Sequence, residues 1–125
     1  MKLSRFILNS ESATLAEVGV VDITLTIPAN FTANAVRETV VPSPIKNALF
    51  RFYLTGGVNS PSIDAPTAIS RTHNGIGILY YVTVYRKDDS TIALACMTTD
   101  GRSVTGTSAT TIHAKVHLFE SPFEA

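Results

Sequence analysis

The stretch Ile76–Tyr85 (IGILYYVTVY) decides the fold class of this chain. Successive side chains of a β-strand point to opposite sides, so the stretch divides into two sets: Tyr80, Val82 and Val84 on one face, and Tyr81, Thr83 and Tyr85 on the other. Such a strand is typical of the middle of a sheet, either covered on both sides or holding an aromatic outer face against a partner. The charged segment 86–90 (RKDDS) leads directly into Thr91–Met97 (TIALACM). This close spacing predicts a β-hairpin.

Alternating apolar and polar residues predict further strands on both sides of the hairpin. The clearest lie at residues 21–27, 48–54 and 110–119, and weaker candidates lie at 4–8 and 36–41. No window of a dozen residues shows sustained helical periodicity. We therefore expect an all-β fold, an antiparallel β-sandwich or jelly-roll-like domain of about six to eight strands. The residues expected to point inward from the last strand are Ile112, Ala114, Val116 and Leu118.

The length of the chain predicts one domain, because 125 residues is close to the commonest domain size. We expect this domain to span residues 1–125, with short terminal arms at about 1–6 and 120–125. Residues 56–75 are rich in Pro, Ser and Asn and are expected to form one long loop, either functional or poorly ordered.

The charge balance favours association. Ten basic and ten acidic residues give a net charge of zero, and only 16% of residues are charged. The average is about 25%, and a neutral protein with few charges tends to associate. We expect permanent contact with copies of the same chain or with a larger body. The alternative is a stable monomer with a Ser/Thr-rich surface.

The sequence also argues against several partners and compartments. It has no basic arm, so binding to nucleic acid lacks an electrostatic basis. The first apolar run is too short for a signal peptide, and no segment approaches the roughly 20 apolar residues of a membrane helix. A single cysteine, Cys96, cannot form an internal disulfide, which fits a reducing compartment or a particle assembled in one.

Candidate reactive groups lack the spacing that catalysis or metal binding needs. His113 and His117 share a strand face but lie about 13 Å apart, too far for one metal ion. Cys96 shares an apolar face with Ile92 and Leu94, as a core residue does. We expect no catalytic, cofactor or metal site, and no enzyme. One weak alternative is a Ca²⁺ site formed by carboxylates in predicted loops: Asp64, Asp88, Asp89 and Asp100.

Aromatic residues are better candidates for a binding surface. Tyr53, Tyr81 and Tyr85 should project opposite the aliphatic core positions, and exposed tyrosines are enriched at protein interfaces and sugar-binding surfaces. The alternative is that they face the second layer of the same sandwich. Phe123 lies in the C-terminal arm, which we expect either to pack on a neighbouring subunit or to fold back on its own domain.

Several short segments carry a resemblance to a known class of proteins: residues 23–29 (ITLTIPA), 43–45 (SPI) leading into 49–53 (LFRFY), 89–94 (DSTIAL) and 116–119 (VHLF). In rhythm and composition the chain resembles the small β-sandwich structural proteins of tailed-phage virions, found at fibre tips and on capsid surfaces. The neutral charge and the scarcity of lysine are more similar to a capsid decoration (cement) protein. RNA-virus jelly-roll coats, in contrast, typically carry a basic arm.

The resemblance implies a non-enzymatic function. Decoration proteins commonly form oligomers and clamp neighbouring capsid subunits, so the implied partners are copies of this chain and other virion proteins such as the major capsid protein. The implied location is the virion, after synthesis in the host cytoplasm. A carbohydrate- or receptor-binding module of a tail or head fibre, contacting a surface polysaccharide, is the alternative. A small enzyme is a distant third possibility and would require a deep pocket that holds a titratable pair.

Overall fold

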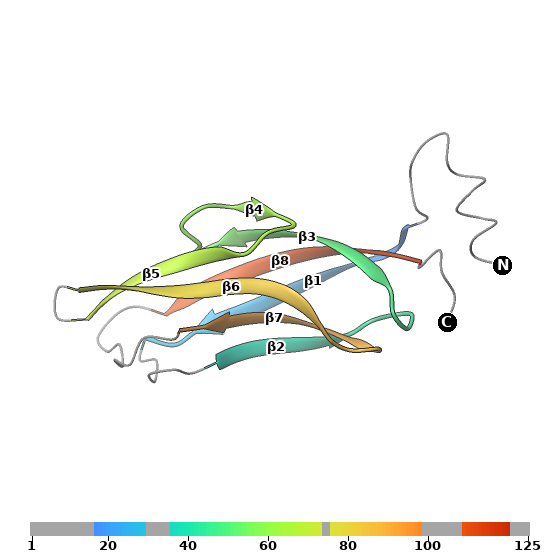
Figure 1. Ribbon diagram of the computed structural model, residues 1–125, viewed down its shortest axis with the longest axis horizontal. Coiled ribbons are helices and arrows are strands. Elements are labelled where there is room, and N and C mark those ends of the chain that lie inside the picture. Colours follow the sequence, from blue (N-terminus) through green and yellow to red (C-terminus); the bar gives the residue numbers. More distant parts are fainter. Residues whose placement is uncertain (1–16, 30–35, 74–75, 99–108, 121–125) are drawn as a thin grey trace.

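The computed structural model describes residues 17–29, 36–73, 76–98 and 109–120, and within them the chain forms eight strands in two antiparallel sheets (Figure 1). One sheet has the order β1-β8-β3-β4 and the other β2-β7-β6-β5. The all-β sandwich expected from the sequence is therefore confirmed. The strands are β1 (Glu17–Ile27), β2 (Val36–Pro42), β3 (Leu49–Gly56), β4 (Ser62–Ile63), β5 (Thr67–His73), β6 (Ile76–Asp88), β7 (Thr91–Met97) and β8 (Thr110–Phe119).

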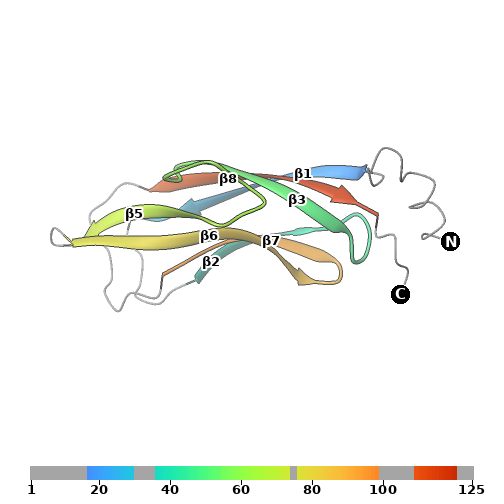
Figure 2. The ribbon, with the colours of Figure 1, turned by 45° about the horizontal axis from the view of Figure 1, so that its top comes forward.

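The core lies between the two sheets, which pack face to face (Figure 2). The sheet β1-β8-β3-β4 contributes every second residue of β8, namely Ile112, Ala114, Val116 and Leu118, all at most 2% exposed. The opposite sheet contributes the completely buried side chains of Tyr80, Val82, Ile92, Leu94 and Cys96. These are the inward positions that the period-two pattern predicts.

The β6–β7 hairpin is also confirmed, with a longer first strand than expected. Strand β6 runs to Asp88, and a bulge between Arg86 and Asp88 shifts the register before the turn. The Asp88 carboxylate accepts a hydrogen bond of 2.8 Å from Ser90 N–H, as turn-forming Asp residues do. The charged residues thus lie partly in the strand and partly in the turn.

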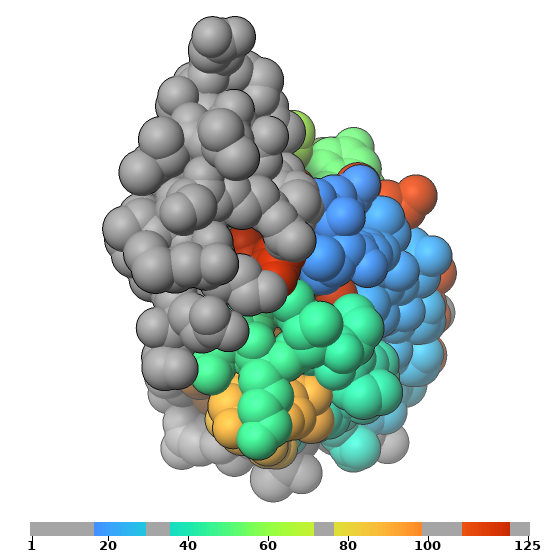
Figure 3. Space-filling model, turned by 90° about the vertical axis from the view of Figure 1, so that its right-hand side faces the viewer, coloured from blue at the N-terminus to red at the C-terminus, as the bar shows by residue number. Residues whose placement is uncertain are grey.

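The segment before β3 closes one end of the sandwich. Figure 3 looks onto this end and shows the β2–β3 connection (green) crossing the tip of the β6–β7 hairpin (orange). Backbone hydrogen bonds of 2.8 Å from Ser43 N–H to Ser90 O and from Asn47 N–H to Asp89 O hold the two together. The tip of the hairpin is therefore fixed to the β2–β3 connection.

The expectation of one long loop at residues 56–75 was wrong, because β4 and β5 form within it. Strand β5 pairs with β6 along its whole length and buries Ile69 and Arg71 in the sandwich. A buried arginine at an inward position breaks the apolar alternation by which strands are recognised. Strand β4 has only two residues, too few for any periodic pattern.

The outer edge of β5 is covered by the segment that precedes it. Asn59 N–H donates to Ala68 O at 2.8 Å, and the Asn59 side-chain oxygen accepts from Ser70 N–H at 3.2 Å. The Asn59 amide also donates to Ser70 Oγ at 2.8 Å. These bonds satisfy backbone groups that an edge strand otherwise exposes.

Arg71 joins the two sheets from the inside. Its guanidinium is carried by β5 and donates to Ile27 O at 3.0 Å and to Thr110 Oγ1 at 3.2 Å, both in the opposite sheet, and to Pro28 O beyond the end of β1. The same group lies 5.4 Å from the centre of the Tyr80 ring. Arg71 is 5% exposed, so a buried charge holds the end of β1 and the start of β8 against β5.

Among the remaining expected strands, residues 36–41 do form a strand, β2, whereas residues 4–8 lie outside the described part of the chain. The arm at 1–6 and residues 121–125, including Phe123, also lie outside it.

The register of β8 can be tested with neighbouring residues. Val116→Ala removes two methyl groups from a fully buried site and should lower the free energy of unfolding by about 1–3 kcal/mol. His117→Ala, on the outer face, should change it by about 0.5 kcal/mol or less. Urea unfolding measures both values. Reversed sensitivities would show that the strand faces are exchanged.

The Arg71 contact provides a second stability test. Arg71→Met leaves the Ile27 and Pro28 carbonyls without this donor and should cost about 1–3 kcal/mol in urea unfolding. Arg51→Met is the matched control, because Arg51 makes an exposed ion pair with Asp64 and should cost less than about 1 kcal/mol. Equal losses in the two variants would contradict a special role for Arg71.

Candidate functional site

The three predicted interface tyrosines lie on the outside of the sandwich. Tyr53 is 42% exposed on the outer face of β1-β8-β3-β4, whereas Tyr81 and Tyr85 are 51% and 37% exposed on the outer face of β2-β7-β6-β5. The alternative, in which these tyrosines face the second layer, is therefore wrong. The structure places them on two opposite faces, so they form two candidate surfaces and not one.

The outer face of β2-β7-β6-β5, here called the apolar face, is made of cross-strand rows of apolar residues. One row runs from Val36 through Met97 to Tyr81, and a second from Val40 through Ala93 to Tyr85. Because neighbouring residues in a row lie about 5 Å apart, the side chains form a continuous surface. Its exposed large apolar side chains are Val36, Val40, Leu79, Tyr81, Tyr85 and Met97.

Charge on the apolar face is confined and neutralised. In the described part of its strands, the charged side chains on this face are Glu38 and Lys87, which form an ion pair, with Asp88 at the hairpin end. Tyr85 OH donates to the Glu38 carboxylate at 2.6 Å. The hydrogen bond from Lys87, followed by that from Tyr85, lowers the pKa of Glu38 below its ordinary value. The pair therefore stays ionised together and adds no net charge.

The outer face of β1-β8-β3-β4, here called the polar face, has a different composition. Its central row is Asp22, Lys115 and Tyr53, and the rows on either side contain His113 and His117. His117 contacts the Glu17 carboxylate, and His113 Nδ1 lies 3.4 Å from Thr24 Oγ1. The two histidines thus have separate partners, and no metal cluster of His, Cys, Asp or Glu exists among the described residues.

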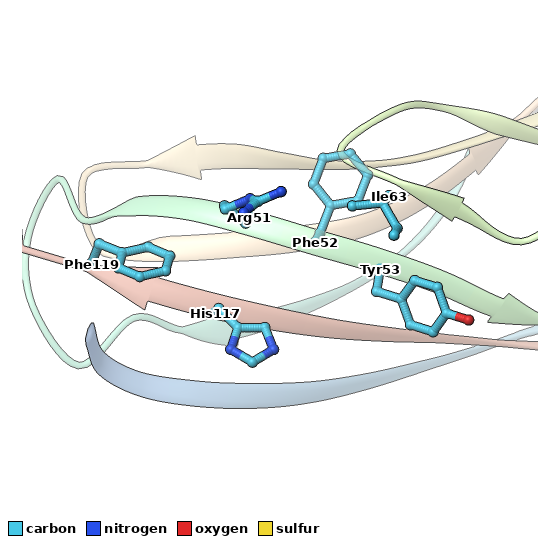
Figure 4. Close-up of a pocket in the computed structure, with 6 residues that line it drawn as sticks. All are labelled: Arg51, Phe52, Tyr53, Ile63, His117 and Phe119. Carbon is cyan, nitrogen blue, oxygen red and sulfur yellow. The ribbon is translucent and has the colours of Figure 1, made fainter. Parts of the chain in front are cut away.

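Two depressions flank Tyr53 on the polar face. The first, with a volume of about 280 Å³, is lined by side chains from β3, β8 and β4 (Figure 4). The second has a volume of about 430 Å³ and lies toward β1. Tyr53 lines both. The other residues are Arg51, Phe52, Ile63, His117 and Phe119 in the first, and Asp22, Ile23, Thr24, Thr55, His113, Ala114 and Lys115 in the second.

Arg51 is held in place beside the first depression by Asp64. Arg51 Nε donates to Asp64 Oδ2 at 2.8 Å, and Phe52 N–H donates to Asp64 Oδ1 at 2.9 Å. Burial by itself raises the pKa of Asp64, but the hydrogen bonds from Phe52 and Arg51 outweigh it and lower the pKa. Asp64 has a φ of 57°, a conformation that Asp tolerates in turns. Asp64 therefore holds Arg51 in a fixed orientation.

The other predicted loop carboxylates have different surroundings. Asp89 Oδ2 lies 3.9 Å from Lys46 Nζ, and the Asp88 carboxylate accepts a hydrogen bond from Ser90 N–H within the hairpin turn. Asp100 lies outside the described residues. The predicted convergence of these carboxylates is not seen in the part of the chain that the structure describes.

Comparisons of this chain with protein-family models, characterised proteins and solved structures found no match. Within the described residues, no helix is long and apolar enough to cross a membrane.

Cys96 is completely buried, and burial raises the pKa of its thiol to about 11. At pH 8 the native thiol should therefore be almost entirely protonated and inaccessible, and should react with Ellman's reagent only when the protein unfolds. Titration in the absence and presence of urea checks this. Rapid labelling of the folded protein would place Cys96 outside the core.

Proposed function

We propose that this protein is a non-enzymatic virion structural protein, a decoration (cement) protein of a tailed phage that assembles through its apolar face. The observation that carries the proposal is the apolar face itself. Among the described residues it exposes six large apolar side chains, and its charged side chains are the Glu38–Lys87 ion pair and Asp88 at the hairpin end. A contiguous apolar patch of several hundred Å² often marks an interaction site. Tyrosine and methionine are also enriched at interfaces.

The size of the apolar face favours assembly of many copies. Four strands about 4.8 Å apart and seven residues long, at about 3.3 Å per residue, give a flat area of about 440 Å². A stable interface between two proteins buries about 800 Å² on each partner. One such contact is therefore weak by itself, but repeated contacts on a regular shell reinforce one another. Decoration of a capsid meets this requirement.

The choice of a capsid rests on the resemblance stated above and on the neutral surface. The proposed partners are copies of this chain and the major capsid protein, and the proposed location is the virion, after synthesis in the host cytoplasm. Net charge zero fits a partner recognised by shape and apolar contact, because a neutral protein is not steered by long-range fields.

Tyr81 and Tyr53 form a matched pair for testing this function. Tyr81→Lys places a charge in the middle of the apolar face and should weaken self-association and binding to expanded capsid shells at least about a hundredfold, because the charge loses its water on assembly. Tyr53→Lys, on the opposite face, should leave both unchanged. Light scattering measures the oligomer and co-sedimentation measures shell binding.

Two results would contradict the proposal. One is a wild-type protein that stays monomeric at high concentration and does not bind the shells of the virus that carries its gene. The other is assembly that survives Tyr81→Lys.

A further inference from the structure

The polar face carries a second site, on the opposite side of the sandwich from the apolar face. We propose that a neutral oligosaccharide binds across Tyr53, in the two depressions that flank it. This inference does not depend on the proposed assembly, because the two faces share no residue. On this part of the surface, two depressions, an aromatic ring and fixed polar groups lie together.

Tyr53 has the properties of a stacking platform. It is 42% exposed, and it lines both depressions. The flat face of an aromatic ring packs against the apolar C–H groups of a pyranose, while the phenolic hydroxyl remains available for hydrogen bonds. Ile63 and Phe119 add apolar surface to the first depression. A polar ligand without apolar faces gains nothing from this arrangement.

Polar groups in both depressions suit sugar hydroxyls, which both donate and accept hydrogen bonds. Arg51 uses its Nε for Asp64, so the rest of its guanidinium is held in a fixed orientation beside the first depression. Asp22, Lys115 and His113 line the second and provide carboxylate, ammonium and imidazole groups. Groups positioned in advance on a rigid sheet lose little entropy on binding.

Charge balance on this face favours a neutral ligand over an acidic one. Arg51 is paired with Asp64, and Lys115 is the direct cross-strand neighbour of Asp22. His117 contacts the Glu17 carboxylate. Each of these three groups thus lies beside an acid, and the described residues of the site form no cluster of unopposed positive charge for a polyanion.

The length of the site favours an oligosaccharide over a single sugar. His117 lines the first depression and His113 the second. Four residues along a strand separate them by about 13 Å. A ligand that fills both depressions and crosses Tyr53 is therefore longer than one ring.

The test uses the full chain and three neutral probes, maltohexaose, cellohexaose and chitohexaose, followed by ¹⁵N chemical shifts. At least one probe should shift amides of β3 and β8 around Tyr53 at millimolar concentration or below. Tyr53→Ala should weaken that binding about tenfold or more, because a half-exposed aromatic contact is lost. Tyr53→Phe should retain most of it, and hexagalacturonate should bind no more tightly than the best neutral probe.

Tyr81→Ala is the matched control, a similarly exposed tyrosine on the apolar face, and it should bind the probe as the wild type does. Tyr53→Ala should keep the wild-type melting temperature and oligomeric state, which separates this site from assembly. Absence of shifts with all three probes, tighter binding of hexagalacturonate, or an equal loss in Tyr81→Ala would overturn the proposal.

Discussion

The two-residue period of β8 is the constraint on which both the core and the polar face depend. This strand is hydrogen-bonded on both sides, to β1 and to β3, and its inward side chains from Ile112 to Leu118 pack against the opposite sheet. A shift of one residue would bury His113 and His117 and expose four apolar side chains at once. The cost of that exchange fixes the register, and the register in turn places Lys115 between Asp22 and Tyr53.

The sandwich separates two kinds of surface that would interfere with each other if mixed. Charged residues gather on the outer face of one sheet, while the other keeps alanine, valine, methionine and tyrosine around the Glu38–Lys87 pair. Because the core lies between them, a partner on one side leaves the other side accessible. A subunit attached through its apolar face would therefore present Tyr53 to the surrounding solution.

The sequence predicted the strong strands and the orientation of their side chains because burial of alternate residues is a local signal. It did not predict β5, since Arg71 takes an inward position that is normally apolar and is stabilised by groups distant in sequence, among them the Ile27 carbonyl and the Thr110 hydroxyl. The depressions beside Tyr53 were missed for a related reason. They depend on the pairing of β3 with β8 and β4 and on the position of Asp64. The backbone conformation of Asp64 and its contact with Arg51 produce no periodic pattern in the sequence.

The hydrogen bonds of Asn59 protect the β5 edge of the sheet β2-β7-β6-β5. A bare strand edge invites another strand to join, and each addition exposes a new edge, so growth by that route has no natural end. Asn59 already occupies the Ala68 carbonyl and the Ser70 amide. A further strand cannot pair with these two groups without displacing Asn59, so this edge offers a poor template for ribbon-like growth.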